Sequence, residues 1–160
     1  MNKIRTLAVL ATVLLAAGLL VACGGDDKED YAKEVESVLE PLGAELQTLG
    51  TELSAATNEA GLVDGLSAAE TEIDNAVTEL EAIDVPGDVE QVNQDLITAI
   101  AGFGDELARV RDAAESGNAA SLQTLALALP QVADDFQKEL SRIQQAAIDA
   151  GVPIEDPGNN

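Results

Sequence analysis

The sequence predicts an all-α protein, an antiparallel up-down four-helix bundle that follows an N-terminal signal peptide. Apolar residues recur at alternating steps of three and four along four successive stretches, which indicates helices that each bury one face. Short segments with Gly, Pro or Asn separate these stretches, so neighbouring helices of about 27 to 32 residues can fold back on each other. No stretch shows the period-two alternation of a strand. We expect one domain, with the bundle at 28–151.

The first expected helix covers about 28–55. Pro41 lies inside it, but the apolar stripe continues in phase across the proline, so we expect a kink and not a break. The start of the second helix is open to two interpretations. Ser67 and Glu70 fit a capping box that would begin the helix there, whereas the apolar stripe extends back to about Asn58. We favour the earlier start because it matches the length of the first helix.

The third expected helix covers about 89–114 and the fourth about 122–147. Between them, Gly117 suits the left-handed position after a helix, and Asn118 can cap the next helix. Pro130 again predicts a local kink.

Two phenylalanines should meet in the middle of the bundle. If the third and fourth helices fold back on each other, Phe103 and Phe136 lie within about one helical turn of each other. Residues 152–160 form a polar tail that we expect to be loosely ordered.

The chain is strongly acidic. Its 160 residues include 30 Asp and Glu but only 8 Lys and Arg, which gives a net charge of -22. Lys3 and Arg5 are the basic residues of the first 22, and without that segment the charge is -24. This charge repels phosphate backbones and anionic lipid surfaces, so we expect no nucleic-acid partner and no direct binding to the bilayer surface. The simplest explanation is that Asp and Glu cover the outer faces of the helices.

Residues 1–22 have the layout of an export signal, with a basic start, an apolar run and a small residue before Cys23. A membrane-spanning helix is the alternative, because the apolar run is near the lower length limit for crossing a bilayer. Cys23 is the only cysteine, so the chain forms no internal disulfide.

The tetrad Leu20-Val21-Ala22-Cys23 resembles the lipobox of bacterial lipoproteins. The resemblance implies that the Cys23 thiol receives a diacylglyceryl group and that a signal peptidase cuts just before this residue. Two or three acyl chains hold a protein durably on a membrane, whereas one does not. Residues 23–27 would then be a flexible tether between the lipid and the bundle.

The helical part, 28–154, is similar in broad pattern to uncharacterised helical-bundle lipoproteins of bacteria. The similarity consists of a Val-Pro turn in mid-chain and a Gly-Val-Pro-Ile ending. This similarity carries no functional residues. The lipobox resemblance implies a lipid-anchored protein on the extracytoplasmic face of a cell membrane or outer membrane.

The usual residues of most cofactor and stacking sites are missing. The chain has no His and no Trp, and its one Met is Met1. This composition removes the ligands of di-iron and haem bundles, and it removes the usual base beside a nucleophile. No segment matches the Asp-x-Asp-x-Asp-Gly calcium loop. We therefore expect no catalytic residue, no cofactor, no metal site and no enzymatic activity.

Two functions remain. The first is a non-enzymatic interaction or structural module at the cell envelope, which binds an envelope protein or component through a helix face. The second is a small-ligand or peptide-binding sensor, in which Pro41 and Pro130 open a space between kinked helices.

Overall fold

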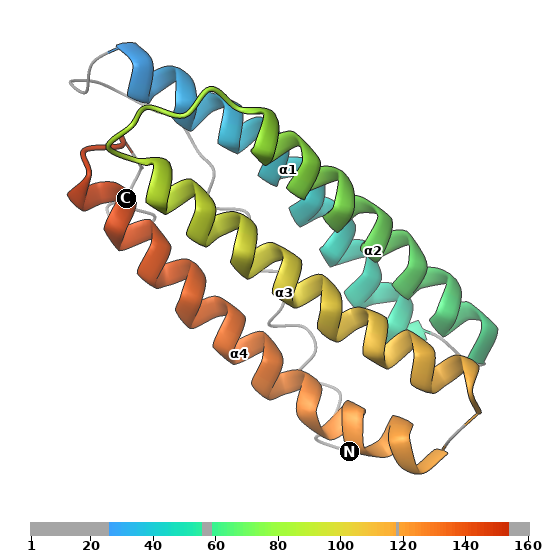
Figure 1. Cartoon of the computed structure of the whole chain (residues 1–160). Coiled ribbons are helices and arrows are strands. Elements are labelled where there is room, and N and C mark those ends of the chain that lie inside the picture. The colour runs from blue at the N-terminus through green and yellow to red at the C-terminus, as the bar shows by residue number, and fades with distance from the viewer. Residues whose placement is uncertain (1–25, 56–58, 118, 154–160) are drawn as a thin grey trace.

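The structure, a computed structural model, describes residues 26–55, 59–117 and 119–153 and confirms the all-α prediction. The described residues form four helices and no strand. These helices are α1 (Asp26–Ala55), α2 (Glu59–Ala82), α3 (Glu90–Glu115) and α4 (Ala119–Asp149), and Figure 1 shows them lying alongside one another.

The start of α2 at Glu59 confirms the earlier of the two expected starts. The capping-box interpretation is wrong, because Ser67 lies inside the helix and its hydroxyl donates to the carbonyl of Val63 at 2.8 Å. With 24 residues, α2 is shorter than expected, whereas the 26 residues of α3 match the length of the expected helix at 89–114. Their connection is correspondingly longer and contains Pro86, which disfavours helical backbone at the residue before it.

Both internal prolines are accommodated without a break. Pro41 lies within α1 and Pro130 within the range of α4, and each helix continues past its proline. This continuity confirms that neither residue ends its helix.

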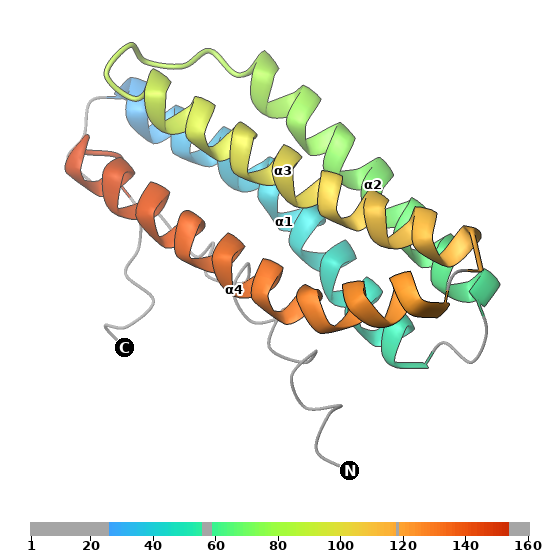
Figure 2. The ribbon, with the colours of Figure 1, turned by 60° about the horizontal axis from the view of Figure 1, so that its bottom comes forward.

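The helices pack in chain order, α1 on α2, α2 on α3 and α3 on α4. Figures 1 and 2 show the chain reversing direction at each connection. The predicted apolar stripes supply the core, because the main buried cluster takes a residue at most turns of α1, α2 and α3 and adds Ile143 from α4. The cluster comprises Val38, Leu42, Leu46, Leu49, Leu66, Ala69, Ile73, Ala76, Leu80, Leu96, Ile100, Phe103, Leu107, Val110 and Ile143.

The two phenylalanines meet as expected, and their rings stack. The ring centroids of Phe103 on α3 and Phe136 on α4 are 4.6 Å apart, with an angle of 16° between the ring planes. The register between α3 and α4 is therefore the one that a turn about Gly117 predicts. Gly117 itself has a φ of 60°, which confirms its left-handed conformation, whereas Asn118 lies outside the described residues.

The C-terminal end of α4 closes with a Schellman motif. Gly151 has a φ of 80° and its N–H donates to Ile148, while the N–H of Val152 donates to Ala147, both at 2.9 Å. Val152 is buried in a second apolar cluster with Tyr31, Val89 and Ala147. It thus belongs to the bundle and not to the expected tail.

The expected tether also needs correction. The helical range of α1 begins at Asp26, so Asp26 and Asp27, which we expected in a flexible tether over 23–27, are helical. The expected boundary at residue 28 therefore falls two residues late.

α3 lies close to α2 at Gly104. A Cβ atom added to Gly104 would lie 2.9 Å from Cγ2 of Ile73, a side chain that is only 2% exposed. A Cβ added to Gly102, also in α3, would meet nothing within 4 Å. The two glycines thus lie in the same helix but differ in the room that an added methyl group would have.

We expect Gly102→Ala to raise the free energy of unfolding by about 0.5–1 kcal/mol, because alanine favours helix. Gly104→Ala gains the same helical preference, but it forces Ile73 and the backbone apart, which costs about 1–3 kcal/mol. Urea unfolding of both variants measures the difference. Equal stabilisation by the two alanines would show that α2 and α3 are not in close contact at Gly104.

Candidate functional site

The predicted lipobox, Leu20-Val21-Ala22-Cys23, lies outside the described residues. Within the part of the chain that the structure describes, no His, Cys, Asp and Glu side chains gather in a group of three or more suited to a metal ion. In the described ranges, no helix combines the length and the hydropathy that crossing a membrane requires.

A buried polar contact joins three helices at one end of the bundle. Asn93 on α3 is 5% exposed and lies between α1 and α2. Its Oδ1 accepts a hydrogen bond from the Tyr31 hydroxyl on α1 at 3.2 Å, and its Nδ2 donates to the carbonyl of Leu80 at 3.2 Å. Leu80 lies in the last turn of α2, where carbonyls lack a partner within the helix, so Asn93 caps α2 as well as linking the helices.

Asn93 is a functional residue that sequence reasoning missed, because it is polar and lies next to the apolar Val92. Val92 is only half-buried, whereas Asn93 takes the inward position. The available signal was spacing, because Asn93 stands four residues after Val89 and three before Leu96, both of them buried.

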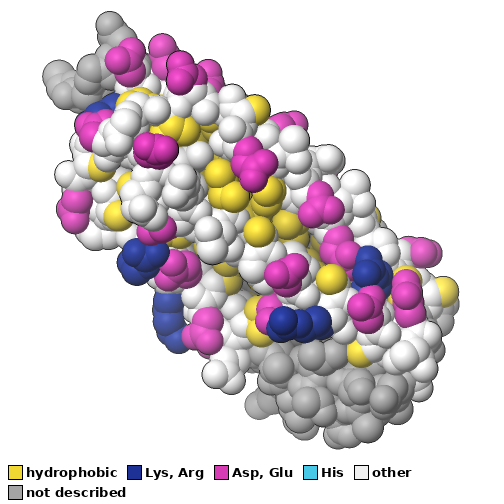
Figure 3. Space-filling view, in the orientation of Figure 1, with side chains coloured by type: hydrophobic (Ala, Val, Ile, Leu, Met, Phe, Trp, Pro, Cys, Tyr) yellow, Lys and Arg dark blue, Asp and Glu magenta, His cyan; other side chains and the backbone are white. Residues whose placement is uncertain are grey.

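A groove of about 510 Å³ opens beside Asn93, between the end of α2 and the beginning of α3. Half-buried apolar side chains form much of its wall, and Figure 3 shows hydrophobic side chains exposed along the line between these helices. Its lining comprises Glu81, Ile83, Val85, Glu90, Asn93, Gln94, Ile97 and Thr98.

The basic residues of the described chain are all engaged elsewhere. Each Lys and Arg between residues 26 and 153 forms an ion pair with at least one carboxylate. They are Lys28, Lys33, Arg109, Arg111, Lys138 and Arg142. None of these pairs involves Glu81 or Glu90, so the carboxylates at the groove have no counter-charge from the described residues.

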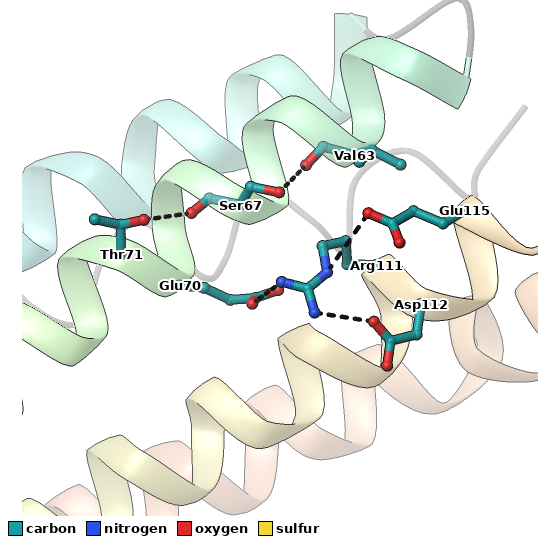
Figure 4. A network of polar contacts seen from close by, with 7 residues as sticks. All are labelled: Val63, Ser67, Glu70, Thr71, Arg111, Asp112 and Glu115. Carbon is teal, nitrogen blue, oxygen red and sulfur yellow. Dashed lines mark hydrogen bonds and ion pairs between the residues drawn. The ribbon is translucent and has the colours of Figure 1, made fainter.

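A second polar network links α2 to α3 toward the opposite end (Figure 4). Glu70 pairs with Arg111, whose guanidinium also donates to Asp112 at 2.9 Å and lies 3.9 Å from Glu115. Burial raises the pKa of Glu70 despite the opposing charge of Arg111. Among the described side chains, the Oε1 atom of Glu70 is buried without a hydrogen-bond partner. The network's plain role is to tie α2 to α3.

Lys28 ties the first turn of α1 to two other segments. Its ammonium pairs with Asp88 in the α2–α3 connection and donates to the carbonyl of Ala150, just beyond α4. This pairing lowers the pKa of Asp88. The end of the bundle that carries the groove is therefore also the end where α1 begins.

Comparison of the chain with protein-family models, with curated proteins and with solved structures gives no match.

Replacement of Asn93 by alanine should lower the free energy of unfolding by about 1–3 kcal/mol, because the Tyr31 hydroxyl and the Leu80 carbonyl lose their partner in a buried place. Asn75→Ala is the matched control, since Asn75 is exposed on α2 and makes one weak contact of 3.5 Å with Glu72. It should change stability by less than about 0.5 kcal/mol. Chemical denaturation measures both, and similar losses would contradict the capping role of Asn93.

Burial raises the pKa of Tyr31 from 10.0 to about 12. As pH rises from 10 toward 12, the unfolded chain loses the phenol proton while the folded chain keeps it, so the free energy of unfolding falls in that window. Tyr31→Phe should remove this part of the pH dependence.

The tyrosinate absorbance of the chain's one tyrosine checks the shift directly. The chain in denaturant provides the control, with an ordinary value near 10. An equally ordinary value in the folded chain would contradict the buried position of Tyr31.

Proposed function

We propose that this protein is a lipid-anchored, extracytoplasmic interaction module of the cell envelope, held on the membrane through lipid on Cys23 and acting without catalysis. The observation that carries the proposal is the tetrad Leu20-Val21-Ala22-Cys23, which ends three residues before α1 begins at Asp26. So short a connection supports a bundle held close to the bilayer.

The placement of the groove supports an interaction role. The beginning of α1, the α2–α3 connection and the end of α4 share one end of the bundle, joined by Lys28 and by the cluster around Tyr31. A lipid on Cys23 would bring this end, with its groove, toward the membrane surface. A partner that is itself anchored in the envelope would meet the groove at a raised effective concentration.

The alternative function, a ligand or peptide site in a space between kinked helices, does not use this groove. The groove is lined by α2, α3 and their connection, and Pro41 is not among its residues. Pro41 is itself exposed at the helix surface.

Cys23→Ala tests the anchor. The chain should then stay uncut before residue 23 and lose its acyl modification, because the acceptor thiol is gone. Mass spectrometry of the N-terminal peptide from membrane extracts measures both effects. Gly24→Ala, which leaves the tetrad intact, is the control and should be processed normally.

An unmodified, membrane-bound chain in the wild type would contradict the lipid anchor. If the anchor holds, crosslinking in intact cells tests the interaction role. A reproducible partner lost in Cys23→Ala supports the proposal, whereas no crosslinked partner would count against an interaction module.

A further inference from the structure

Part of the lining of the groove between α2 and α3 is apolar. Ile83, Val85 and Ile97 pack on the buried clusters with one side and are half-buried overall. Each therefore leaves apolar surface on the groove. A complementary apolar side chain that entered would remove this surface from water, at about 25 cal/mol for each Å² covered.

The rim of the groove is acidic on both sides. Glu81, in the last turn of α2, and Glu90, the first residue of α3, are both exposed and both line the groove. Asp84 is exposed in the connection between them. Because the basic residues of the described chain are paired elsewhere, this rim is left with uncompensated negative charge.

We propose that this groove docks a cationic, amphipathic segment of a partner protein, with its apolar side chains on Ile83, Val85 and Ile97 and its Lys or Arg side chains on Glu81 and Glu90. The proposal rests on the interaction function proposed above and names its surface and its partner's chemistry. Charge complementarity selects the occupant, because the rim attracts cations and orients a segment that is basic on one face.

A second copy of this chain does not fit the same groove. The chain carries a net charge of -22, so an approaching copy meets like charge. The docking segment must supply the Lys or Arg side chains, because those of the described chain already form ion pairs within its own fold.

The direct test uses the full chain in nanodiscs of zwitterionic lipid, with empty nanodiscs as the blank. The probe is a fluorescent, photoreactive peptide of Leu and Lys, spaced to form an amphipathic helix. We expect saturable binding by anisotropy above the blank, weakened by salt. After illumination, mass spectrometry should find crosslinks within residues 81–98.

Removal of the rim charges by Glu81→Gln with Glu90→Gln should weaken binding about fivefold, the size expected for two exposed charge pairs. The control is Glu40→Gln with Asp134→Asn, which removes two exposed carboxylates from α1 and α4. It should weaken binding less than about twofold, because screening limits the reach of distant charges. All four positions are exposed, so the fold should be retained.

Three results would overturn the docking site: no saturable binding above the blank, crosslinks outside the groove, or equal losses in the two double variants. Equal binding of a Leu and Glu peptide would overturn the cationic partner. A peptide of the same Leu and Lys composition in a non-amphipathic order should bind more weakly, and equal binding would show that Ile83, Val85 and Ile97 have no role in docking.

The acyl state of Cys23 is measured in the same preparation. Failure of the peptide to dock on a chain that is lipidated therefore counts against the groove alone. Absence of lipid from a chain that docks the peptide counts against the anchor alone.

Discussion

The packing of α2 against α3 organises this bundle from end to end. At one end Asn93 reaches from α3 to cap the last turn of α2, and toward the other Arg111 of α3 pairs with Glu70 of α2. Between them Gly104 lets the two backbones approach until Ile73 fills the space that a side chain would need. α1 packs on α2 and α4 packs on α3, so each outer helix depends on the position of its inner neighbour.

Most of the fold could be predicted from the sequence because each helix buries apolar residues that recur at regular spacing. The start of α2 near residue 59 and the proximity of Phe103 to Phe136 follow from that spacing and from one turn. Ser67 misleads because its hydroxyl can bond backward within a helix as readily as it can cap one. Val152 was missed because its burial depends on a Schellman turn that brings it back onto Ala147.

The candidate site could not be predicted in the same way. Asn93 is a polar residue in an apolar position, and its partners, Tyr31 and Leu80, come from two other helices. The groove depends on how far α2 extends before Pro86 and on where α3 begins, which spacing alone does not fix. The acidic residues of the rim can be found in the sequence. The ion pairs of Lys28 with Asp88 and of Arg142 with Asp95, which leave the rim without counter-charge, cannot.

Lys28 also has a mechanical meaning. It joins the first turn of α1 to the α2–α3 connection and to the backbone that follows α4. A pulling force applied to the N-terminal side of α1 therefore loads three segments in parallel and does not peel one helix from the bundle turn by turn. Separation of α1 at that end requires the simultaneous loss of the ion pair, the hydrogen bond and the packing of Tyr31. This end of the bundle therefore resists mechanical unfolding.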